Sequence, residues 1–587
     1  MMTLIAGILS RNNRPVSDSA CASLRQSLSR NPADEVSAFK DRSSYFAKVD
    51  IGAFGEPGVF KDSGGALSFV AGEPLLGSRD GESCSSRLQD LTAIHAHCLN
   101  NNWDILRKAA GTFCVVHYQP QAGRVLLIAD KFGIRPFYYW IGDDVIVFAN
   151  ALRILEEIPL VPKKMDLRAV TEIVGLGFPL GDRTPYAGIS LLAPAEILEI
   201  TNGRVSRHRY WRWDQIEASS DSEQELLKTV FGSFQAGVKR RIANDRTTAA
   251  YLSGGLDSRC VVAALRHRDV SVHSFNFARS GTQDYSFGNH FAQRIGSIHQ
   301  SVPKERGDSI PDYSLLMAKA WGQTNHRLEL PPERPQLVWS GEGGSVLLGQ
   351  VHISEEIVKL MRAGKIDDAI EEYLRREQAY VPAKLFKPQI VEVLGDIIKQ
   401  GIREELNDLR TDDPGRAFYL FLMQNDQRRK LARHFENIDL HRLEFQLPFF
   451  DGAFLASVIA APIDVCLRHR FYVKWLSHFP AAVTAVAWQA YPGHEPCPIP
   501  VPPELSYQWD DEYQAEERAA QKRSILTRAS ELLSAPDFPR EILNKRNLRL
   551  AAWMHSLGLR DLEYAIEAAQ TFYAYWRKCG GEFALPA

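Results

Sequence analysis

A glycine-rich turn near the middle of the chain has the residue types that hold a phosphate and its metal ion. It reads Ser253-Gly254-Gly255-Leu256-Asp257-Ser258. Two glycines let the backbone turn tightly with its N–H groups exposed, and a helix that begins at once points its first amides the same way. The two serine hydroxyls add donors, whereas the Asp257 carboxylate would repel phosphate unless Mg²⁺ lay between them. No Gly-Lys-Ser/Thr follows, so this is not a Walker loop. It predicts a metal-bound pyrophosphate site.

The elements around this turn alternate in the way that a parallel sheet requires. The patterns predict strands over 247–252, 270–277 and 337–340, and helices over 223–243, 258–266 and 285–295. Such alternation indicates an α/β sheet covered on both faces, with ligands at the carboxyl ends of its strands. From about residue 355 the chain is mainly helical.

The first 210 residues have a different pattern. Short β-type runs, punctuated by Gly, Asp and Asn, indicate a sheet built of hairpins, and an α+β domain with packed sheets fits them. We therefore expect three parts: a sandwich domain over 1–210, a parallel-sheet domain over 220–490, and a proline-rich strap with helices over 491–587.

Bulk composition is that of an ordinary globular protein. The chain has 587 residues, 45% of them hydrophobic and 24% charged, with a formal net charge of -2. This charge gives no indication of nucleic acid as a partner. The eight cysteines show no CxxC spacing, which predicts reduced thiols in a cytoplasmic protein. The apolar start is too short for a membrane span, and no signal peptide is expected.

Several ordered motifs together resemble the asparagine synthetase family. These are the phosphate turn, the segments 130–139, 273–275 and 340–343, and the run 444–451. Members of that family join a glutaminase-type (Ntn hydrolase) domain to an ATP pyrophosphatase domain with the SGGxDS loop. The resemblance covers most of the chain, and it implies ATP and Mg²⁺ as cofactors and an AMP-forming amide ligase as the activity.

The glutaminase half departs from the family pattern. A glutaminase of this type needs a cysteine at the mature amino terminus, because the terminal cysteine is both nucleophile and base. The chain begins Met1-Met2-Thr3, and the Asn-Gly-Glu that helps hold glutamine reads Ala71-Gly72-Glu73. We therefore expect glutamine hydrolysis to be lost and this domain to remain as a structural partner.

Two groups of the wider family fit that loss, β-lactam synthetases and lasso-peptide cyclases. In both, an amine of the same molecule attacks the adenylated carboxylate. The stretch 487–498, which includes His494, resembles that of proteobacterial lasso cyclases, although a proline-rich packing strap is the alternative. The resemblance then implies a precursor peptide as substrate, with a leader-binding protein and a leader protease as partners. The alternatives are an ammonia-using asparagine synthetase, a β-lactam synthetase-like enzyme and a non-catalytic homologue.

The resemblance also implies where nucleotide and metal bind. Leu252 and Phe277 fall where relatives hold adenine, and Ser340 and Gly341 line the same side. The second Mg²⁺-binding Asp of relatives falls on Ser345, whose hydroxyl is a poorer ligand. Asp257 remains the metal ligand, and Asp284 is a substitute for the missing carboxylate unless it is a helix cap.

Three residues are candidates for the chemical step. Glu342 falls where relatives place a residue close to the reacting centre, so it is a candidate base for the amine, with a turn-capping carboxylate as the alternative. Glu444 is a second candidate, for which the alternative is a structural ion pair. Lys474 is a candidate to offset charge at phosphorus, or else a surface or packing residue.

Overall fold

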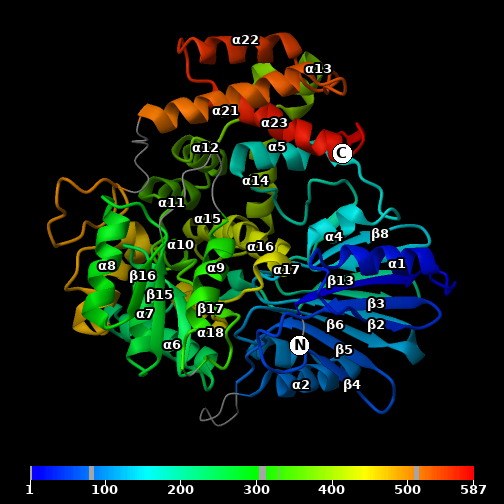
Figure 1. Cartoon of the computed structure of the whole chain (residues 1–587), viewed down its shortest axis with the longest axis horizontal. Coiled ribbons are helices and arrows are strands. Elements are labelled where there is room, and N and C mark those ends of the chain that lie inside the picture. The colour runs from blue at the N-terminus through cyan, green and yellow to red at the C-terminus, as the bar shows by residue number, and fades with distance from the viewer. Residues whose placement is uncertain (1–2, 78–84, 303–311, 330, 508–514, 587) are drawn as a thin grey trace.

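The computed structural model describes residues 3–77, 85–302, 312–329, 331–507 and 515–586. An antiparallel sandwich and a parallel-sheet domain lie side by side, and a group of helices that includes the carboxyl-terminal ones covers them at the top of Figure 1. The predicted fold class, an Ntn-type sandwich followed by a parallel-sheet domain with helices, is confirmed. Eight cysteines occur in the sequence, and the seven in the described residues are free thiols; Cys84 lies outside those residues.

The sandwich consists of two six-stranded antiparallel sheets. The first has the strand order β11-β8-β9-β1-β3-β2, with bounds Ile189–Leu191, Tyr138–Ile141, Val145–Ala149, Leu4–Ser10, Ser44–Val49 and Ser37–Lys40. The second has the order β13-β12-β7-β6-β5-β4, with bounds Arg204–Arg209, Glu196–Thr201, Arg124–Ala129, Phe113–Gln119, Leu67–Gly72 and Val59–Lys61.

Alternating side chains explain why these sheets pack face to face. Phe46 and Phe148 from the first sheet meet Phe69 and Val116 from the second in one buried cluster. The outer face of the second sheet packs on α2 (Arg87–Leu99), and that of the first on α1 (Asp18–Ser27) and α4 (Leu152–Glu157). The short α3 (Asp104–Lys108) and α5 (Leu167–Leu176) complete this domain.

The second domain has a five-stranded parallel sheet in the order β16-β15-β14-β17-β18. The strand bounds in that order are Ile298–Ser301, Ser271–Asn276, Thr247–Tyr251, Leu337–Trp339 and Glu444–Gln446. Helices α6 (Glu223–Ile242), α7 (Asp257–Arg266), α8 (Gln283–Ile295) and α9 (Tyr313–Asn325) accompany the sheet. Because β15 and β17 flank β14, the segments that follow these three strands meet at one edge.

The rest of the chain is helical, as predicted. After β17 the helices are α10 (Gly344–Leu347), α11 (Glu355–Arg362), α12 (Ile366–Arg376), α13 (Pro388–Leu394), α14 (Ile397–Asp408), α15 (Pro414–Leu422), α16 (Arg428–Glu436) and α17 (Ile438–His441). Those after β18 are α18 (Gly452–Ala460), α19 (Ile463–Cys466), α20 (Arg470–Trp475), α21 (Ala515–Ser534), α22 (Lys545–Ser556) and α23 (Glu563–Lys578).

The carboxyl-terminal part of the chain reaches back to the first domain. Strand β19 (Phe583–Ala584) pairs with β10 (Met165–Asp166) of the sandwich domain. No single described helix is long and apolar enough to cross a membrane; one bent pair, Gly452–Ala460 with Ile463–His478, reaches that length and composition only when its two parts are added together.

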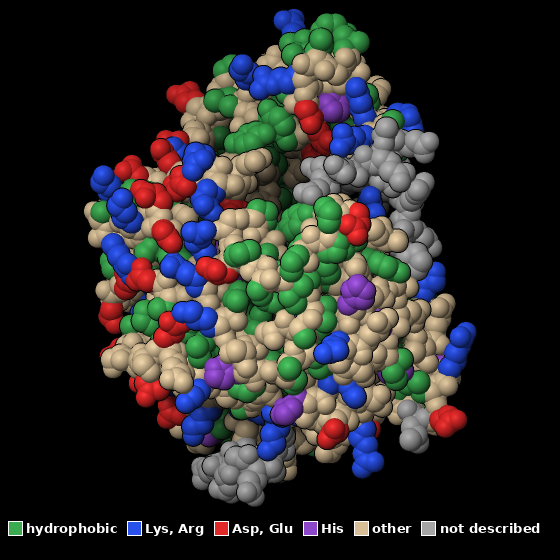
Figure 2. All heavy atoms as spheres, turned by 90° about the vertical axis from the view of Figure 1, so that its left-hand side faces the viewer, with side chains coloured by type: hydrophobic (Ala, Val, Ile, Leu, Met, Phe, Trp, Pro, Cys, Tyr) green, Lys and Arg blue, Asp and Glu red, His purple; other side chains and the backbone are tan. Residues whose placement is uncertain are grey.

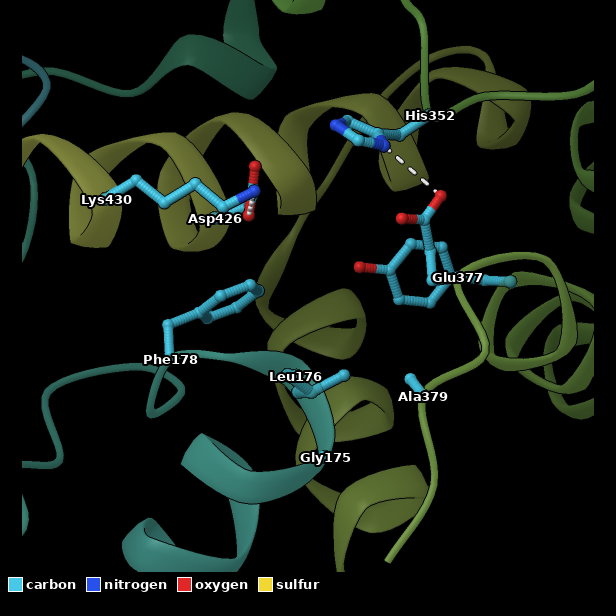
Figure 3. A pocket seen from close by; sticks show the side chains of 9 residues that line it. Gly175, Leu176, Phe178, His352, Glu377, Ala379, Asp426 and Lys430 are labelled. Carbon is cyan, nitrogen blue, oxygen red and sulfur yellow. Dashed lines mark hydrogen bonds and ion pairs between the residues drawn. The ribbon is translucent and has the colours of Figure 1, made fainter. Parts of the chain in front are cut away.

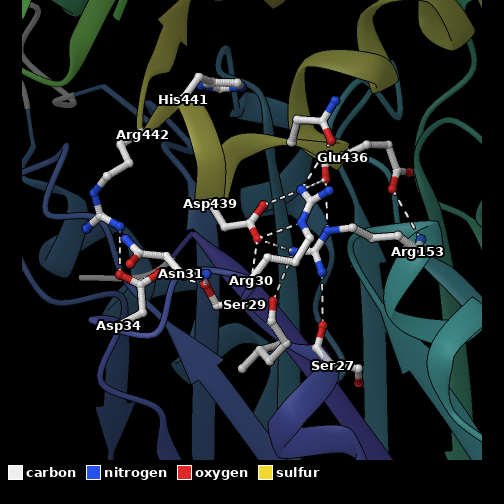
Figure 4. Close-up of polar contacts among 12 residues, drawn as sticks. Ser27, Ser29, Arg30, Asn31, Asp34, Arg153, Glu436, Asp439, His441 and Arg442 are labelled. Carbon is white, nitrogen blue, oxygen red and sulfur yellow. Dashed lines mark hydrogen bonds and ion pairs between the residues drawn. The ribbon is translucent and has the colours of Figure 1, made fainter. Parts of the chain in front are cut away.

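Buried polar contacts hold the two domains together (Figure 4). Arg30 of the sandwich binds Asp439 at the start of α17 with an N–O distance of 2.6 Å, and the side chain of Asp439 is fully buried. Arg153 donates to the Glu436 carbonyl at 2.9 Å, and Arg442 pairs with Asp34 at 2.6 Å. These contacts join the sandwich to the segment that includes α16 and α17.

Candidate nucleotide-binding site

The glycine-rich turn closes on itself through its two serines. The hydroxyl of Ser258 accepts from the Ser253 amide at 2.9 Å and lies 3.0 Å from the Ser253 hydroxyl. The Gly254 amide donates to Asp284 at 2.5 Å, and a Cβ at Gly254 would lie 2.7 Å from the Asp284 Cα. Only glycine allows this close approach, because the atoms in the way belong to the backbone.

Asp257 lies at the centre of the turn. Its Oδ1 accepts hydrogen bonds from the Ser345 hydroxyl and from Tyr472, both at 2.8 Å, and its Oδ2 accepts one from the Ser345 amide at 2.8 Å. Burial raises the pKa of Asp257 to about 6, although these three bonds act in the opposite direction. Gly344 lies close as well, since a Cβ there would be 2.6 Å from the Asp257 carboxyl carbon.

This donor set fits a Mg²⁺ ion held through one carboxylate oxygen. Oδ1 already accepts two hydrogen bonds, whereas Oδ2 accepts one and keeps a second acceptor position. Magnesium is commonly held by one carboxylate, substrate phosphates and water. Among the described residues, no group of three His, Cys, Asp or Glu side chains is arranged for a metal. Asp257 is therefore the residue that would hold Mg²⁺, together with phosphate oxygens.

The pKa of Asp257 makes the metal-dependent reaction sensitive to acid. The carboxyl holds its proton up to about pH 6, where an ordinary Asp is ionised, and Mg²⁺ binds only the ionised form. At a fixed Mg²⁺ concentration, we expect ATP–pyrophosphate exchange to fall as the pH drops through about 6. More Mg²⁺ should shift the midpoint to lower pH. A midpoint near pH 4 that does not respond to Mg²⁺ would contradict this assignment.

Asp284, the expected substitute metal ligand, binds the backbone of the phosphate turn. Its Oδ1 accepts the Gly254 amide, and burial raises the pKa of Asp284 to about 6. The sequence predicted Asp284, near the start of α8, to be either a helix cap or a metal ligand. The side chain that caps α8 is that of Thr282. Asp284 instead holds the backbone of the phosphate turn.

The turn after β17 packs against the phosphate turn. A Cβ at Gly341 would lie 2.4 Å from the Ser258 amide, and the Ser340 hydroxyl accepts the Glu342 amide at 3.2 Å. Glu342 is 44% exposed and lies 3.6 Å from the His434 imidazole. Partial burial works to raise the pKa of Glu342, but His434 outweighs it and holds the pKa below its ordinary value.

The two residues expected at the adenine lie on neighbouring segments of the same sheet edge. The Leu252 carbonyl accepts from Asn276 at 3.0 Å, and its amide donates to the Phe275 carbonyl at 2.9 Å. Phe277 is buried, with its ring centroid 5.9 Å from that of Tyr251. Parallel pairing of β14 with β15 brings the two together, as the motif order implies.

The phosphate turn forms the floor of a cavity of about 610 Å³ that is open to solvent. Ser345, His469 and Tyr507 line it, and so does the stretch 487–498 that was compared with lasso cyclases, through Trp488, Gln489, Ala490, Tyr491, His494 and Glu495. The resemblance to lasso cyclases had already singled out the stretch 487–498 as a candidate part of the site. Nothing in the sequence singled out His469 or Tyr472, because neither belongs to a recognisable motif.

The structure does not support the expected catalytic roles of Glu444 and Lys474. Glu444 is fully buried in an ion pair with Arg135 of the sandwich and does not line the cavity. Lys474 pairs at 2.5 Å with Glu223, and its side chain is 56% exposed. Successive helical residues are rotated by about 100°, so Lys474 points away from Tyr472, which faces Asp257. In the structure both side chains are thus held in ion pairs.

A second cavity, of about 350 Å³, lies where the two domains meet (Figure 3). Phe178 reaches it from the sandwich domain, and Tyr373, His352 and Glu377 from the helical part. Asp426 lies in a short π-helix, Met423–Gln427, and pairs with Lys430 at 2.6 Å. The charge of Lys430 helps to lower the pKa of both Glu377, in this cavity, and Glu342.

Comparison with known proteins gives two family matches and several distant relatives. Residues 84–211 match a glutamine amidotransferase domain, and residues 230–476 match asparagine synthase. Asparagine synthetase (glutamine-hydrolyzing) 3 of Bacillus subtilis is 26% identical over 221 residues, 37% of this chain and 34% of that protein. The putative asparagine synthetase (glutamine-hydrolyzing) 2 of Methanocaldococcus jannaschii is 24% identical over 265 residues, 42% of this chain and 51% of that protein. Asparagine synthetase (glutamine-hydrolyzing) of Bos taurus is 22% identical over 380 residues, 60% of this chain and 57% of that protein. The chain thus spans between about a third and somewhat over half the length of these relatives.

Proposed function

We infer that this chain is a member of the asparagine synthetase family, with a glutamine amidotransferase-type domain and an asparagine synthase domain. On that premise, we propose that it is an ATP-dependent, AMP-forming amide ligase that closes a macrolactam ring in a precursor peptide, as lasso-peptide cyclases do. The observation that supports a ligase function is the phosphate turn with Asp257 at the floor of an open cavity. The turn after β17, which contains Glu342, packs against it.

In the first step, the phosphate turn holds ATP while an Asp or Glu carboxylate of the peptide attacks the α-phosphorus. The bond from the α-phosphorus to the bridging oxygen breaks, and pyrophosphate leaves with that oxygen and its electron pair. Mg²⁺, when bound at Asp257, supplies charge neutralisation for the phosphates. Donors that face the leaving group stabilise the charge that develops on it.

In the second step, the peptide's own amino-terminal amine attacks the acyl-adenylate. The new amide bond forms as the bond from the acyl carbon to the AMP oxygen breaks, and the amine must lose a proton. Glu342 is the base that we propose for this proton, because its carboxylate is ionised, accessible and paired with His434. Positioning of the amine supplies most of the rate, since the reaction is then effectively unimolecular.

Three features of the sandwich domain support an amine source other than glutamine. Glu73 pairs with Arg334 at 3.2 Å and accepts from Gln446 at 2.8 Å, so it links the two domains. Burial raises the pKa of the Cys114 thiol to about 12, and the pKa of Cys21 is raised as well, so neither is an activated nucleophile. Ala71, in place of the family's Asn, has no polar side chain to offer glutamine.

The second cavity supports a substrate larger than aspartate. It presents aromatic, acidic and basic side chains, which provide room and partners beyond the phosphate turn. A leader-binding protein and a leader protease remain part of the proposal as partners. Aspartate with ammonia is the second candidate pair of substrates, favoured by the names of the relatives.

The test is turnover of ATP by the purified protein with synthetic peptides that have a free amino terminus and one Asp or Glu. We expect AMP and pyrophosphate to form with a peptide, together with a product lighter by one water, and we expect added glutamine to change nothing. Blocking the amino terminus by acetylation should remove the cyclic product but keep pyrophosphate release. Turnover with aspartate and ammonia alone would replace this proposal by asparagine synthesis.

A further inference from the structure

Helix α22 has apolar side chains on two opposite faces. Its inner face, which includes Leu548, is buried against the helices around it. Its outer face carries Leu550, Trp553 and Leu557, which follow one another at spacings of three and four residues and therefore share one side of the helix. These three side chains and that of Leu559 are between 52% and 64% exposed. A helix that is apolar all round is normally buried all round, so the outer face of α22 lacks a cover within the described part of the chain.

This face lies at one extremity of the molecule. Figure 1 shows α22 as the outermost helix at the top, beyond α21 and α23. Figure 2 shows hydrophobic side chains together with Lys and Arg side chains at the same end. None of the residues that line the nucleotide cavity belongs to α22, so its outer face is a separate feature from the site described above.

The outer face of α22 is also cationic. The stretch 542–560 contains four Lys or Arg residues and no Asp or Glu, whereas the whole chain has a formal net charge of -2. Arg546 and Arg549 lie one helical turn before the exposed apolar side chains on the same side of the helix. A Cβ at Gly558 would lie 4.0 Å from the Lys522 Nζ, so this ammonium flanks the other end of the face. Within the described residues, none of these three cations forms an ion pair.

The intrinsic stability of α22 explains neither feature. Lys545 and Arg546 lie in its first turn, where the helix dipole makes cations unfavourable, and no acidic residue offsets them there. Leaving Leu and Trp side chains in water forgoes the free energy that burying them would give. Both features therefore indicate an external surface that is apolar and negatively charged, because a cationic face is complementary to an anionic partner.

An anionic lipid bilayer has both properties, because its charged headgroups lie directly over acyl chains. We propose that the outer face of α22 docks this protein onto the surface of such a bilayer. The face consists of Arg546, Arg549, Leu550, Trp553, Leu557 and Leu559, with Lys522 beside it. The Trp and Leu side chains enter the boundary between headgroups and acyl chains, where the amphipathic indole is favoured, and the long Arg side chains reach the lipid phosphates. The helix lies on the bilayer and does not cross it.

Two other occupants fit the face less well. A second copy of this chain would place the same cations opposite one another, and like charges across an interface oppose pairing. A protein groove binds through a few buried anchors, among which Trp and Arg are common and Leu is under-represented, whereas three of the four apolar side chains of this face are leucines. Interfacial helices, in contrast, combine Trp and Leu with cations.

The test is co-sedimentation of the full chain with vesicles, made either of phosphatidylcholine alone or of equal parts of phosphatidylcholine and phosphatidylglycerol. We expect binding to the anionic vesicles only, and binding that weakens as salt screens the charges. Trp553→Ser with Leu557→Ser should weaken binding by at least about a hundredfold, because two large apolar side chains no longer leave water. Arg546→Gln with Arg549→Gln should weaken it by about thirtyfold, since each cation near an anionic surface contributes about fivefold.

Two variants elsewhere serve as matched controls. Ile298→Ser removes an apolar side chain that is equally exposed on β16, and Arg14→Gln with Arg204→Gln removes two exposed cations from the sandwich domain. Both should bind vesicles as the wild type does, and all four variants should keep the wild-type melting temperature because they change exposed side chains.

Three results would overturn the inference. These are no binding to the anionic vesicles, equally tight binding to the neutral ones, and binding that survives both α22 variants. A dimer in solution that Trp553→Ser with Leu557→Ser dissociates, without any binding to vesicles, would assign the face to a second copy of the chain instead. None of these measurements involves turnover, so their outcome is independent of the proposed reaction.

Discussion

Asp257→Asn lowers the rate of ATP–pyrophosphate exchange by about a thousandfold and leaves the protein folded. The change removes the one carboxylate positioned to hold Mg²⁺ at the phosphate turn. Metal and charge stabilisation of this kind contribute several kcal/mol to the transition state, and each 1.36 kcal/mol is tenfold in rate. Because burial already disfavours the charged form and raises the pKa of Asp257 to about 6, the neutral Asn should hold or raise the melting temperature.

Asp269→Asn is the matched control for this variant. Asp269 is exposed just beyond the other end of α7 and has a φ of 58°, which Asn accepts, so exchange should be unchanged. Exchange by Asp257→Asn within about tenfold of the wild type would mean that the metal is held elsewhere, and the assignment of the site would fail.

Glu444→Gln lowers the free energy of unfolding by about 3–5 kcal/mol, because it leaves the buried Arg135 guanidinium without its carboxylate. Arg135 also stacks 4.4 Å from the Phe435 ring, so it cannot turn out to water without losing that packing. Urea denaturation measures the loss, and we expect the activity per folded molecule to fall much less than the stability.

A double variant separates a structural Glu444 from a catalytic one. Arg135→Met with Glu444→Leu replaces the buried pair by apolar side chains, an exchange that is often neutral or stabilising. We expect this variant to recover both stability and peptide-dependent pyrophosphate release. A stable double variant that is inactive would return Glu444 to the catalytic candidates.

The phosphate turn could be predicted because its parts are consecutive in the chain. Glycines, hydroxyls, a carboxylate and a helix start all fall within six residues, and local backbone geometry brings them to one point. The order of the motifs implied that Leu252, Phe277 and Ser340 lie at one edge of the sheet, because the carboxyl ends of neighbouring parallel strands meet there.

Lys474 and His469 show why the rest of the site could not be predicted. Both lie near the same short helix, and only its orientation against the phosphate turn decides which side chain enters the cavity. The sequence contains no signal for that orientation. It depends on the packing of Tyr472 onto Asp257, 215 residues earlier in the chain.

The sequence by itself indicated the resemblance to asparagine synthetases, the two kinds of sheet and the position of the phosphate turn, because strand and helix periods and consecutive motifs are local properties of the chain. Only the tertiary structure decided that Ser345 donates to Asp257, that Glu444 pairs with Arg135 across the domain boundary, and that His469 and the stretch 488–495 line the cavity. These contacts join residues that are far apart in the chain. Burial and steric fit select which of these contacts form, and no local sequence pattern encodes either.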